Sequence, residues 1–347
     1  MSSLPASSTS APYRTAVFHG GDLSWARGIF GGTPGEWQDL STGINPTPYP
    51  VGELPGEAWT RLPDTDLERR LGEAAAAYYG TPDADCLVPA PGSQSLIQIL
   101  PYLRPRGTVA VIGPTYGEHA HCWAFAGHSV RTVAALGDVP PDADAAAVTN
   151  PDNPTGRRYD PEALAALAAR LAARGGFLVV DEAFADVAPE LSLAPRGGAE
   201  GLVVLRSFGK FFGLAGGRLG FAAAPPEVAG MLRARLGPWA VSGPAAWVAL
   251  RALADRDWIE KTRDALARRM SKQEELLRGA GLEIIGATSL FCLVGTEDAA
   301  ALFEYLAGRR ILVRSFPEHP GWLRFGIAPD ATGLDRLERA LKDWNGR

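Results

Sequence analysis

Residues 143–184 read ADAAAVTNPDNPTGRRYDPEALAALAARLAARGGFLVVDEAF. The runs Ala143–Thr149 and Phe177–Val180 are apolar and bounded by turn residues, which is typical of buried strands. Between them, Pro161–Ala173 has the pattern of a helix, with Asp160 as its N-cap and a proline at its first position. This succession predicts strands that lie parallel in a sheet and are connected by a helix on one face.

The same alternation extends from this unit in both directions. Further predicted strands are Cys86–Pro89, Thr108–Ile112, Ser129–Ala134, Leu202–Arg206 and Leu219–Ala223. Further predicted helices are Asp66–Tyr79, which stops at Gly80, Gln94–Leu103 and Tyr116–Ala126. The chain is therefore expected to be an α/β protein whose large domain contains a mostly parallel seven-stranded sheet.

The pattern changes after residue 225. A long helical region covers Pro244–Ala280 with a break near Asp255. Predicted strands follow at Leu282–Ile285, Leu290–Val294, Ile311–Arg314 and Trp322–Ile327, with helices at Glu297–Gly308 and Thr332–Trp344. We therefore expect four parts: a disordered tail at 1–12, an extended arm with turns at 13–60 that packs with the small domain, a large domain at 61–235, and a small α+β domain at 236–347.

Composition excludes several classes of protein. The 347 residues are 46% hydrophobic and 21% charged, as in globular proteins, and the net charge of −5 disfavours nucleic acid as a partner. No apolar run approaches the roughly 20 residues of a membrane span, and the first residues lack a signal-peptide pattern. The three cysteines are far apart, without the spacing of a metal site, and are interpreted as reduced thiols of a cytoplasmic protein.

Two polar segments follow predicted strands, where α/β sheets bind their ligands. Residues 90–94, APGSQ, form a Gly-Ser turn into a helix, which offers backbone N–H groups to an anion or is an ordinary serine N-cap. Residues 149–156, TNPDNPTG, form a rigid loop that could hold the Asn153 amide at a fixed point.

Two more such segments carry ionisable groups. Asp181 and Glu182 end an apolar strand, where a carboxylate could bind a metal, act as a base, pair with a cationic ring nitrogen or cap a helix. Lys210 lies among Phe and Gly residues, where burial would lower its pKa and make its amine a nucleophile. The segment lacks the upstream glycine of a phosphate-binding P-loop and the companion motifs of penicillin-binding enzymes.

One cofactor, pyridoxal 5'-phosphate, suits all four segments: an anion site, an amide, a carboxylate and a buried lysine. The motifs NPDNPTG (150–156), VVDEAF (179–184) and SFGKFFGLAGGRLG (207–220) occur in that order. With them, the chain resembles the fold-type I pyridoxal-phosphate enzymes of the aminotransferase class I/II superfamily.

This resemblance implies a role for each matching residue. Lys210 matches the lysine that bonds to the cofactor, Asp181 the partner of the pyridine nitrogen, and Tyr116 the aromatic residue stacked on the ring; these three are the expected catalytic residues. Asn153 matches the hydrogen-bond partner of the ring hydroxyl. The phosphate is expected to lie against Gly92, Ser93, Gln94, Ser207 and Arg218.

Two further motifs, HGGD (19–22) and DLSTGINP (39–46), narrow the resemblance. They are similar to those of the L-threonine-O-3-phosphate decarboxylases of cobalamin biosynthesis, a family related to the histidinol-phosphate aminotransferases. A small phosphorylated amino acid is the implied substrate, with the carboxylate on Arg324. The implied substrate-binding residues are His19, Gly43, Ile44, Asn45, Asn153, Arg314 and Arg324.

Three functions, two catalytic and one not, stay open at this point. The first is decarboxylation of L-threonine O-3-phosphate to (R)-1-amino-2-propanol O-phosphate and CO2. The second is transamination of histidinol phosphate or an aromatic amino acid with 2-oxoglutarate, although Phe184 stands where that family commonly has tyrosine. The third is a cofactor-bound regulatory or binding domain without catalysis. A homodimer is implied, but Leu62 replaces the tyrosine that reaches the partner's cofactor phosphate in the aminotransferases.

Overall fold

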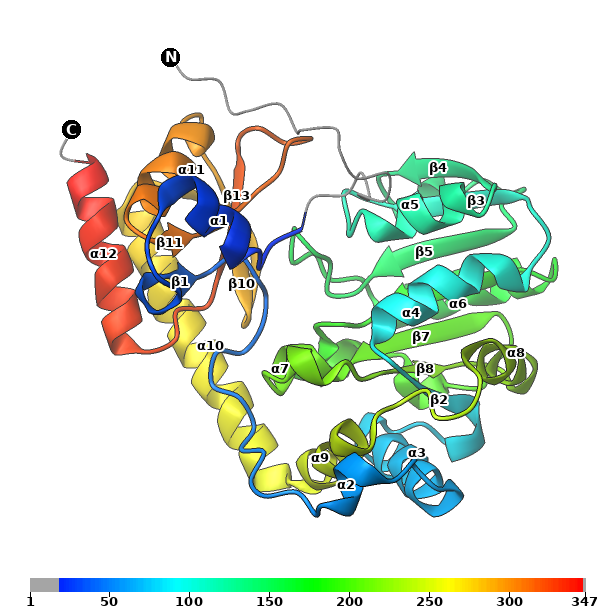
Figure 1. Ribbon diagram of the computed structural model, residues 1–347. Helices are drawn as coiled ribbons and strands as arrows, with labels where there is room; N and C mark the ends of the chain where they lie inside the picture. The colour runs from blue at the N-terminus through cyan, green and yellow to red at the C-terminus, as the bar shows by residue number, and fades with distance from the viewer. Residues whose placement is uncertain (1–18, 346–347) are drawn as a thin grey trace.

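A seven-stranded sheet and a four-stranded sheet organise residues 19–345, which the computed structural model describes (Figure 1). The predicted tail at 1–12 and the first residues of the predicted arm lie outside these described residues. The large sheet lies on one side of the molecule and the small sheet on the other (Figure 1).

The large sheet confirms the predicted α/β fold. Its strand order is β2-β8-β7-β6-β5-β3-β4, and only β8 runs antiparallel to its neighbours. The strands are β2 (Leu87–Ala90), β3 (Thr108–Ile112), β4 (Ser129–Val133), β5 (Ala145–Thr149), β6 (Phe177–Asp181), β7 (Leu202–Ser207) and β8 (Gly220–Ala223). Strands β5, β6 and β7 are buried along their whole length, so their sequences are apolar runs rather than alternating ones.

Alternate residues of these strands enter two separate hydrophobic cores. Val179 and Val203 pack in the core beside α4 (Ser93–Ile99), α5 (Glu118–Phe125) and α8 (Pro226–Leu236). Leu178 and Val204, one position away, pack in the core that includes α3 (Thr65–Tyr79) and α6 (Pro161–Ala172). Successive side chains of a strand point to opposite faces, and helices on both faces bury them all.

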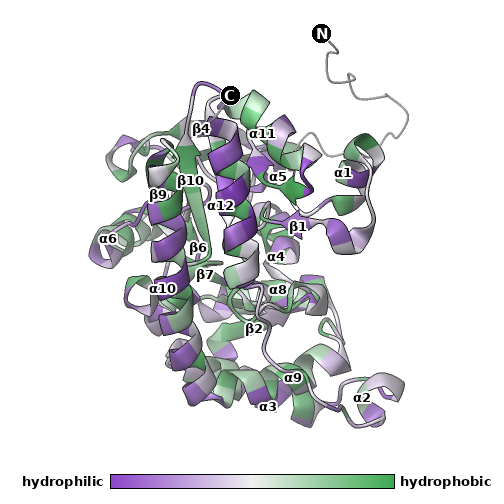
Figure 2. Cartoon of the chain, turned by 90° about the vertical axis from the view of Figure 1, so that its left-hand side faces the viewer, coloured by the Kyte–Doolittle hydropathy of each residue, from purple (hydrophilic) through white to green (hydrophobic). Residues whose placement is uncertain are grey.

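The small sheet is antiparallel, with the order β12-β13-β10-β9. Its strands are β9 (Glu283–Thr288), β10 (Phe291–Gly295), β12 (Arg314–Ser315) and β13 (Trp322–Gly326), and its helices are α10 (Arg256–Gly279), α11 (Ala299–Gly308) and α12 (Ala331–Asn345). Nearby, β1 (Gln38–Asp39) pairs in parallel with β11 (Ile311–Leu312), which ties an early segment to this side of the molecule. Figure 2 shows hydrophilic residues on the outward faces of α10 and α12 and hydrophobic residues along β10.

Helix ends follow their local chemistry. The Asp64 side chain accepts from the N–H of Leu67 at the start of α3, which ends at Gly80 in a left-handed conformation with φ 72°. The predicted break near Asp255 is confirmed: Asp255 ends α9 (Gly243–Ala254), and its carboxylate accepts from the N–H of Trp258 to start α10. Within residues 19–345 no helix is both long and apolar enough to cross a membrane.

Two expectations about helices were wrong. The arm, predicted to be extended, contains α1 (Leu23–Phe30), which the Asp22 side chain caps by accepting from the N–H of Trp25, and the single turn α2 (Glu57–Thr60). Leu23, Ala26 and Phe30 do recur at helical spacing, but glycine pairs flank this short helix on both sides and favour the prediction of turns. Helix α8 was not predicted, although a proline at its start and Gly237 after its end mark it. The predicted domain boundary at residue 235/236 stays a prediction.

Short 3-10 helices complete the described chain. They are η1 (Pro34–Glu36), η2 (Ala84–Cys86), η3 (Leu100–Leu103), η4 (Leu136–Asp138), η5 (Ala185–Val187), η6 (Pro189–Leu191), η7 (Ala194–Arg196) and η8 (Ala215–Gly217).

A glycine contact joins the loop after β5 to the small sheet. A Cβ atom on Gly286 of β9 would collide with the carbonyl oxygen of Thr155 in that loop. A Cβ on Gly156, which has φ +69°, would lie 2.7 Å from the carbonyl oxygen of Ala287. Glycine at both positions lets the two backbones touch, so the position of Asn153 depends on the small sheet.

We expect Gly286→Ala to lower the free energy of unfolding by about 1–3 kcal/mol, because the added methyl group must displace backbone rather than a flexible side chain. The matched control is Gly230→Ala in α8, where a Cβ meets no atom within 4 Å. This control should raise stability by about 0.5–1 kcal/mol, since alanine favours helix. Urea denaturation of both variants measures the difference, and equal stabilities would contradict the contact.

Candidate active site

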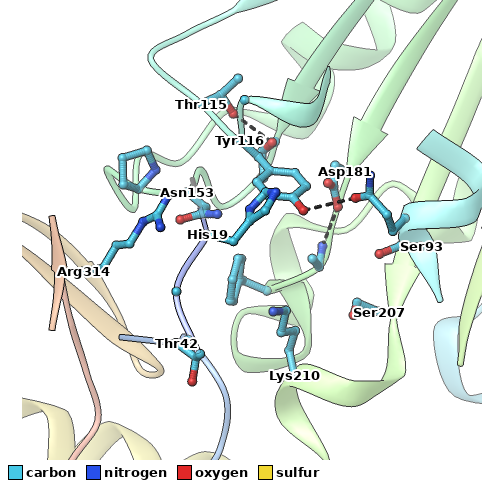
Figure 3. Close-up of a pocket in the computed structure, with 18 of the residues that line it drawn as sticks. His19, Thr42, Ser93, Thr115, Tyr116, Asn153, Asp181, Ser207, Lys210 and Arg314 are labelled. Carbon is cyan, nitrogen blue, oxygen red and sulfur yellow. Dashed lines mark hydrogen bonds between the residues drawn. The ribbon is translucent and has the colours of Figure 1, made fainter. Parts of the chain in front are cut away.

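A cavity of about 510 Å³ opens at the carboxyl ends of the parallel strands and faces the small sheet (Figure 3). All but two of the residues predicted for the site line it. These are His19, Gly43, Gly92, Ser93, Gln94, Tyr116, Asn153, Asp181, Ser207, Lys210, Arg218, Arg314 and Arg324. The two exceptions are Ile44 and Asn45.

Lys210 lies in the short helix α7 (Phe208–Phe211), immediately after β7. Its amine points into the pocket (Figure 3), 5.8 Å from the centre of the Phe184 ring, and makes no hydrogen bond to any described residue. Burial, together with the positive charges of Arg324 and Arg218, lowers the pKa of Lys210 to about 8, against the opposing effect of Asp181. A substantial fraction of this amine is therefore uncharged near neutral pH and can act as a nucleophile.

Asp181, at the end of β6, is 3% exposed and held by two contacts. Its Oδ1 atom accepts from the backbone N–H of Ala183 (3.1 Å), and its Oδ2 atom lies 3.0 Å from Nε2 of the buried His119. These contacts fix the orientation of the carboxylate, which lines the pocket. The sequence interpretation missed His119; its place three residues after Tyr116, on the inner face of a helix, was the available signal.

The neighbouring carboxylate, Glu182, does not line the pocket. It accepts from Arg206 Nη1 (2.7 Å) and from the backbone N–H of Leu193 (2.6 Å), and Arg206 Nη2 donates to Asp186 (2.8 Å). Adjacent strand residues point to opposite faces, so one carboxylate is available to a ligand and the other binds a buried arginine. Losing one partner of such a buried cluster typically costs about 3–5 kcal/mol.

Another wall of the pocket is suited to a phosphate. Ser93 and Ser207 line it, and neither hydroxyl has a hydrogen-bond partner among residues 19–345. Gly92, with φ +84°, lies so close to Arg218 that a Cβ would be 2.7 Å from its Nη2 atom. Arg218 itself has φ 48°, a left-handed conformation that is rare for a side chain other than glycine and is often kept for function.

Arg314 and Arg324 are directly opposed on β12 and β13 and face the same pocket. Arg324 donates to Oδ1 of Asn153 and to the carbonyl oxygen of Ser41 (2.8 Å), while its buried Nε has no partner in the described part of the chain. Burial lowers the pKa of Arg324 to about 9, assisted by the charge of Arg314, and burial lowers that of Arg314 to about 10. Two guanidinium groups this close, one buried and one half-buried, are suited to anionic ligands.

Gly43, Ile44 and Asn45 act differently from one another. A Cβ on Gly43 would lie 2.8 Å from the Phe184 ring and 2.9 Å from Phe291, so its backbone forms a tight wall of the pocket. Ile44 and Asn45 lie outside the pocket lining. The Asn45 side chain donates to the carbonyl oxygen of Phe211 (2.9 Å), and its N–H donates to that of Lys210 (2.9 Å), so Asn45 braces the Lys210 turn from behind.

The donor set fits pyridoxal 5'-phosphate. Lys210 offers an amine with a lowered pKa, and Asp181 offers a fixed carboxylate. Ser93, Ser207 and Arg218 offer hydroxyl groups and a cation for the phosphate. Tyr116 supplies a flat ring on the same cavity wall. Within residues 19–345 no group of three His, Cys, Asp or Glu side chains is arranged to hold a metal ion.

The pKa of Lys210 leads to a pH prediction. When protein freed of cofactor is mixed with pyridoxal phosphate, covalent capture should accelerate about tenfold per pH unit below 8 and level off above it, because only the neutral amine reacts. Arg324→Gln should move this midpoint upward by removing a neighbouring positive charge. The exposed Arg174→Gln is the control and should leave it unchanged. A midpoint near 10.5, the ordinary lysine value, would contradict the account.

Known proteins share both the sequence and the fold. Residues 53–341 match the model of the aminotransferase class I and II family. The chain is 47% identical over 327 residues to the threonine-phosphate decarboxylase of Sinorhizobium sp. (94% of this chain, 97% of that one). It is 46% identical over 326 residues to the threonine-phosphate decarboxylase of Pseudomonas aeruginosa (93% and 96%). The crystal structure of histidinol-phosphate aminotransferase from Sinorhizobium meliloti, in complex with pyridoxal-5'-phosphate, superimposes with a TM-score of 0.81 at 22% identity, covering 98% of this chain and 99% of that one. The chain belongs to the aminotransferase class I and II family.

Proposed function

We propose that this protein is a pyridoxal-phosphate-dependent decarboxylase that converts L-threonine O-3-phosphate to (R)-1-amino-2-propanol O-phosphate and CO2. The observation that carries the proposal is its similarity, over nearly the whole chain, to proteins named threonine-phosphate decarboxylase. The pocket supports it, since Arg314 and Arg324 can bind two anionic groups besides the cofactor phosphate. In cells this reaction would supply the aminopropanol linker of cobalamin.

The cofactor, when bound, supplies a cationic ring that withdraws the electron pair left at the substrate Cα when CO2 departs. The protein's part begins with Asp181, whose negative charge keeps a proton on the ring nitrogen. His119 holds that carboxylate in place from behind. Tyr116 and the backbone at Gly43 restrict the space on the pocket walls and exclude water.

Arg324 is suited to hold the substrate carboxylate. Arg324 is 7% exposed, and its contacts with Asn153 and Ser41 fix the plane of its guanidinium. A bidentate pair with this guanidinium would determine which bond of the Cα atom stands perpendicular to the ring, and this decides between loss of CO2 and loss of a proton. Arg314 and His19, which line the same pocket, would receive the substrate phosphate.

Lys210 is suited to return a proton to Cα after CO2 has left. Its pKa of about 8 lets it hold and release a proton near neutral pH. Phe184 offers no hydroxyl that could compete as a donor beside it. The product then keeps its amine, and no 2-oxo acid is consumed.

An assay with purified holoprotein tests this proposal. With L-threonine phosphate, CO2 and amine phosphate should form in equal amounts, at a rate that 2-oxoglutarate does not change. Lys210→Ala should reduce this rate by several orders of magnitude, because the variant loses the amine that bonds to the cofactor and returns the proton. The rest of the pocket should stay intact.

Two results would overturn the decarboxylase assignment. Glutamate formation that requires 2-oxoglutarate would show an aminotransferase. No turnover by a holoprotein that binds the substrate would favour a regulatory or binding role.

We further propose that the protein is a homodimer in the cytoplasm, divided into domains as the sequence predicts. Val51, Trp59 and Leu62 are large hydrophobic side chains left exposed along one segment, which suits contact with a second chain. The three cysteines are free thiols, which suits a reducing compartment. Sedimentation of the holoprotein should show a species of two chains; a single-chain species that remains fully active would exclude the dimer.

A further inference from the structure

A chain of side-chain contacts runs behind the pocket wall and ends at His19. Tyr116 donates its hydroxyl to Oε1 of Gln94 (3.1 Å), and Nε2 of Gln94 donates to Oε2 of Glu118 (2.9 Å). The other Glu118 oxygen, Oε1, lies 2.8 Å from Nε2 of His19. Three of these residues line the pocket, and the fourth, Glu118, does not.

Glu118 is an unusual residue to bury. It is the first residue of α5 and is 3% exposed, yet neither an arginine nor a lysine pairs with it among the described residues. Its two oxygens accept from Gln94 and His19, with a longer contact from Cys122 Sγ (3.7 Å). Burying a carboxylate costs free energy unless hydrogen bonds or opposite charges replace its contacts with water.

His19 is held from two sides of the molecule. On the side of the large sheet, Glu118 of α5 binds its ring. On the other side, Gly21 donates its N–H to Oγ of Ser41 (2.7 Å), and a Cβ on Gly20 would collide with the Ser41 carbonyl oxygen, which Arg324 also binds. His19 is therefore a bridge between the two walls of the pocket, and Figure 3 shows its ring beside Tyr116.

We propose that Glu118 is a positioning residue that acts through His19 to select substrates with a phosphate group. This inference rests on the proposed function. A carboxylate only accepts, so Nε2 of His19 carries the proton in this contact. The other ring nitrogen, Nδ1, has no partner within residues 19–345 and remains for a ligand. An anionic oxygen of a ligand there can accept from Nδ1 when both ring nitrogens carry protons.

The contact with His19 lets Glu118 affect ligand binding although Glu118 does not line the pocket itself. In metal sites, a histidine whose second nitrogen is held by a carboxylate keeps its ring orientation, and loss of that partner typically costs 10–100-fold in affinity or activity; we expect an effect of the same order for His19. His19 is 42% exposed along its side chain, so without Glu118 its ring is free to turn toward solvent. Arg314 and Arg324 do not depend on this contact.

Binding to the holoprotein by calorimetry tests the inference with two probes. O-Phosphoethanolamine has an amine and a phosphate but no carboxylate, whereas L-threonine has an amine and a carboxylate but no phosphate. Glu118→Gln should weaken binding of O-phosphoethanolamine by about 10–100-fold. It should leave the affinity for L-threonine within about twofold, since Arg324 is untouched.

Two comparisons separate positioning from a general structural effect. Glu227→Gln removes a first-turn glutamate from α8, where the side chain is exposed, and should change neither affinity. In a His19→Ala background, Glu118→Gln should add no further loss, because Glu118 is proposed to act on the phosphate only through His19. The cofactor absorbance of each variant, recorded first, shows whether the pocket is intact.

Either of two outcomes would overturn the inference: equal weakening of both probes by Glu118→Gln, or no weakening of O-phosphoethanolamine. Both probes bind whether or not CO2 is released, so this test does not depend on the reaction. A failure of the proposed function is seen separately, as a wild-type protein that releases no CO2 from L-threonine phosphate.

Discussion

One constraint organises this protein: an amine must remain partly uncharged inside a pocket that also collects anions. Lys210 meets it because β7 delivers the residue into an enclosed space, where burial and the charge of Arg324 lower its pKa to about 8. The negative charge of Asp181 acts in the opposite direction and raises this pKa. The contact of Asp181 with His119 holds its carboxylate in place. Positive charge in the pocket thus serves two purposes, since it favours the neutral lysine and binds anionic substrate groups.

Both sheets are needed to build this pocket. The large sheet supplies Asp181 and Lys210 from the ends of adjacent strands, whereas Arg314 and Arg324 come from the small sheet. They meet where Gly286 of the small sheet lets its backbone touch the loop that contains Asn153. Arg324 donates to both Asn153 and Ser41, so the guanidinium holds the two sides together as well as facing the ligand.

Most of the fold and of the pocket lining could be predicted from the sequence because both depend on local patterns. Buried parallel strands are apolar runs, and the polar segments after them necessarily gather at one edge of the sheet. What could not be predicted depends on contacts between distant segments. His119 and Glu118 acquire their roles only when α5 packs beside Asp181 and His19, and Asn45 is drawn behind Lys210 rather than into the pocket. Helix α1 was missed because it is short and lies between two glycine pairs that favour turns.

The most direct measurement locates the covalent bond on which the account depends. The holoprotein is treated with borohydride, digested and mapped by mass spectrometry, and the reduced cofactor label should be found on the peptide that contains Lys210. A label on another lysine, or none on a protein shown to retain the cofactor, would contradict the central claim. Lys210→Ala, carried through the same procedure, should lose the label.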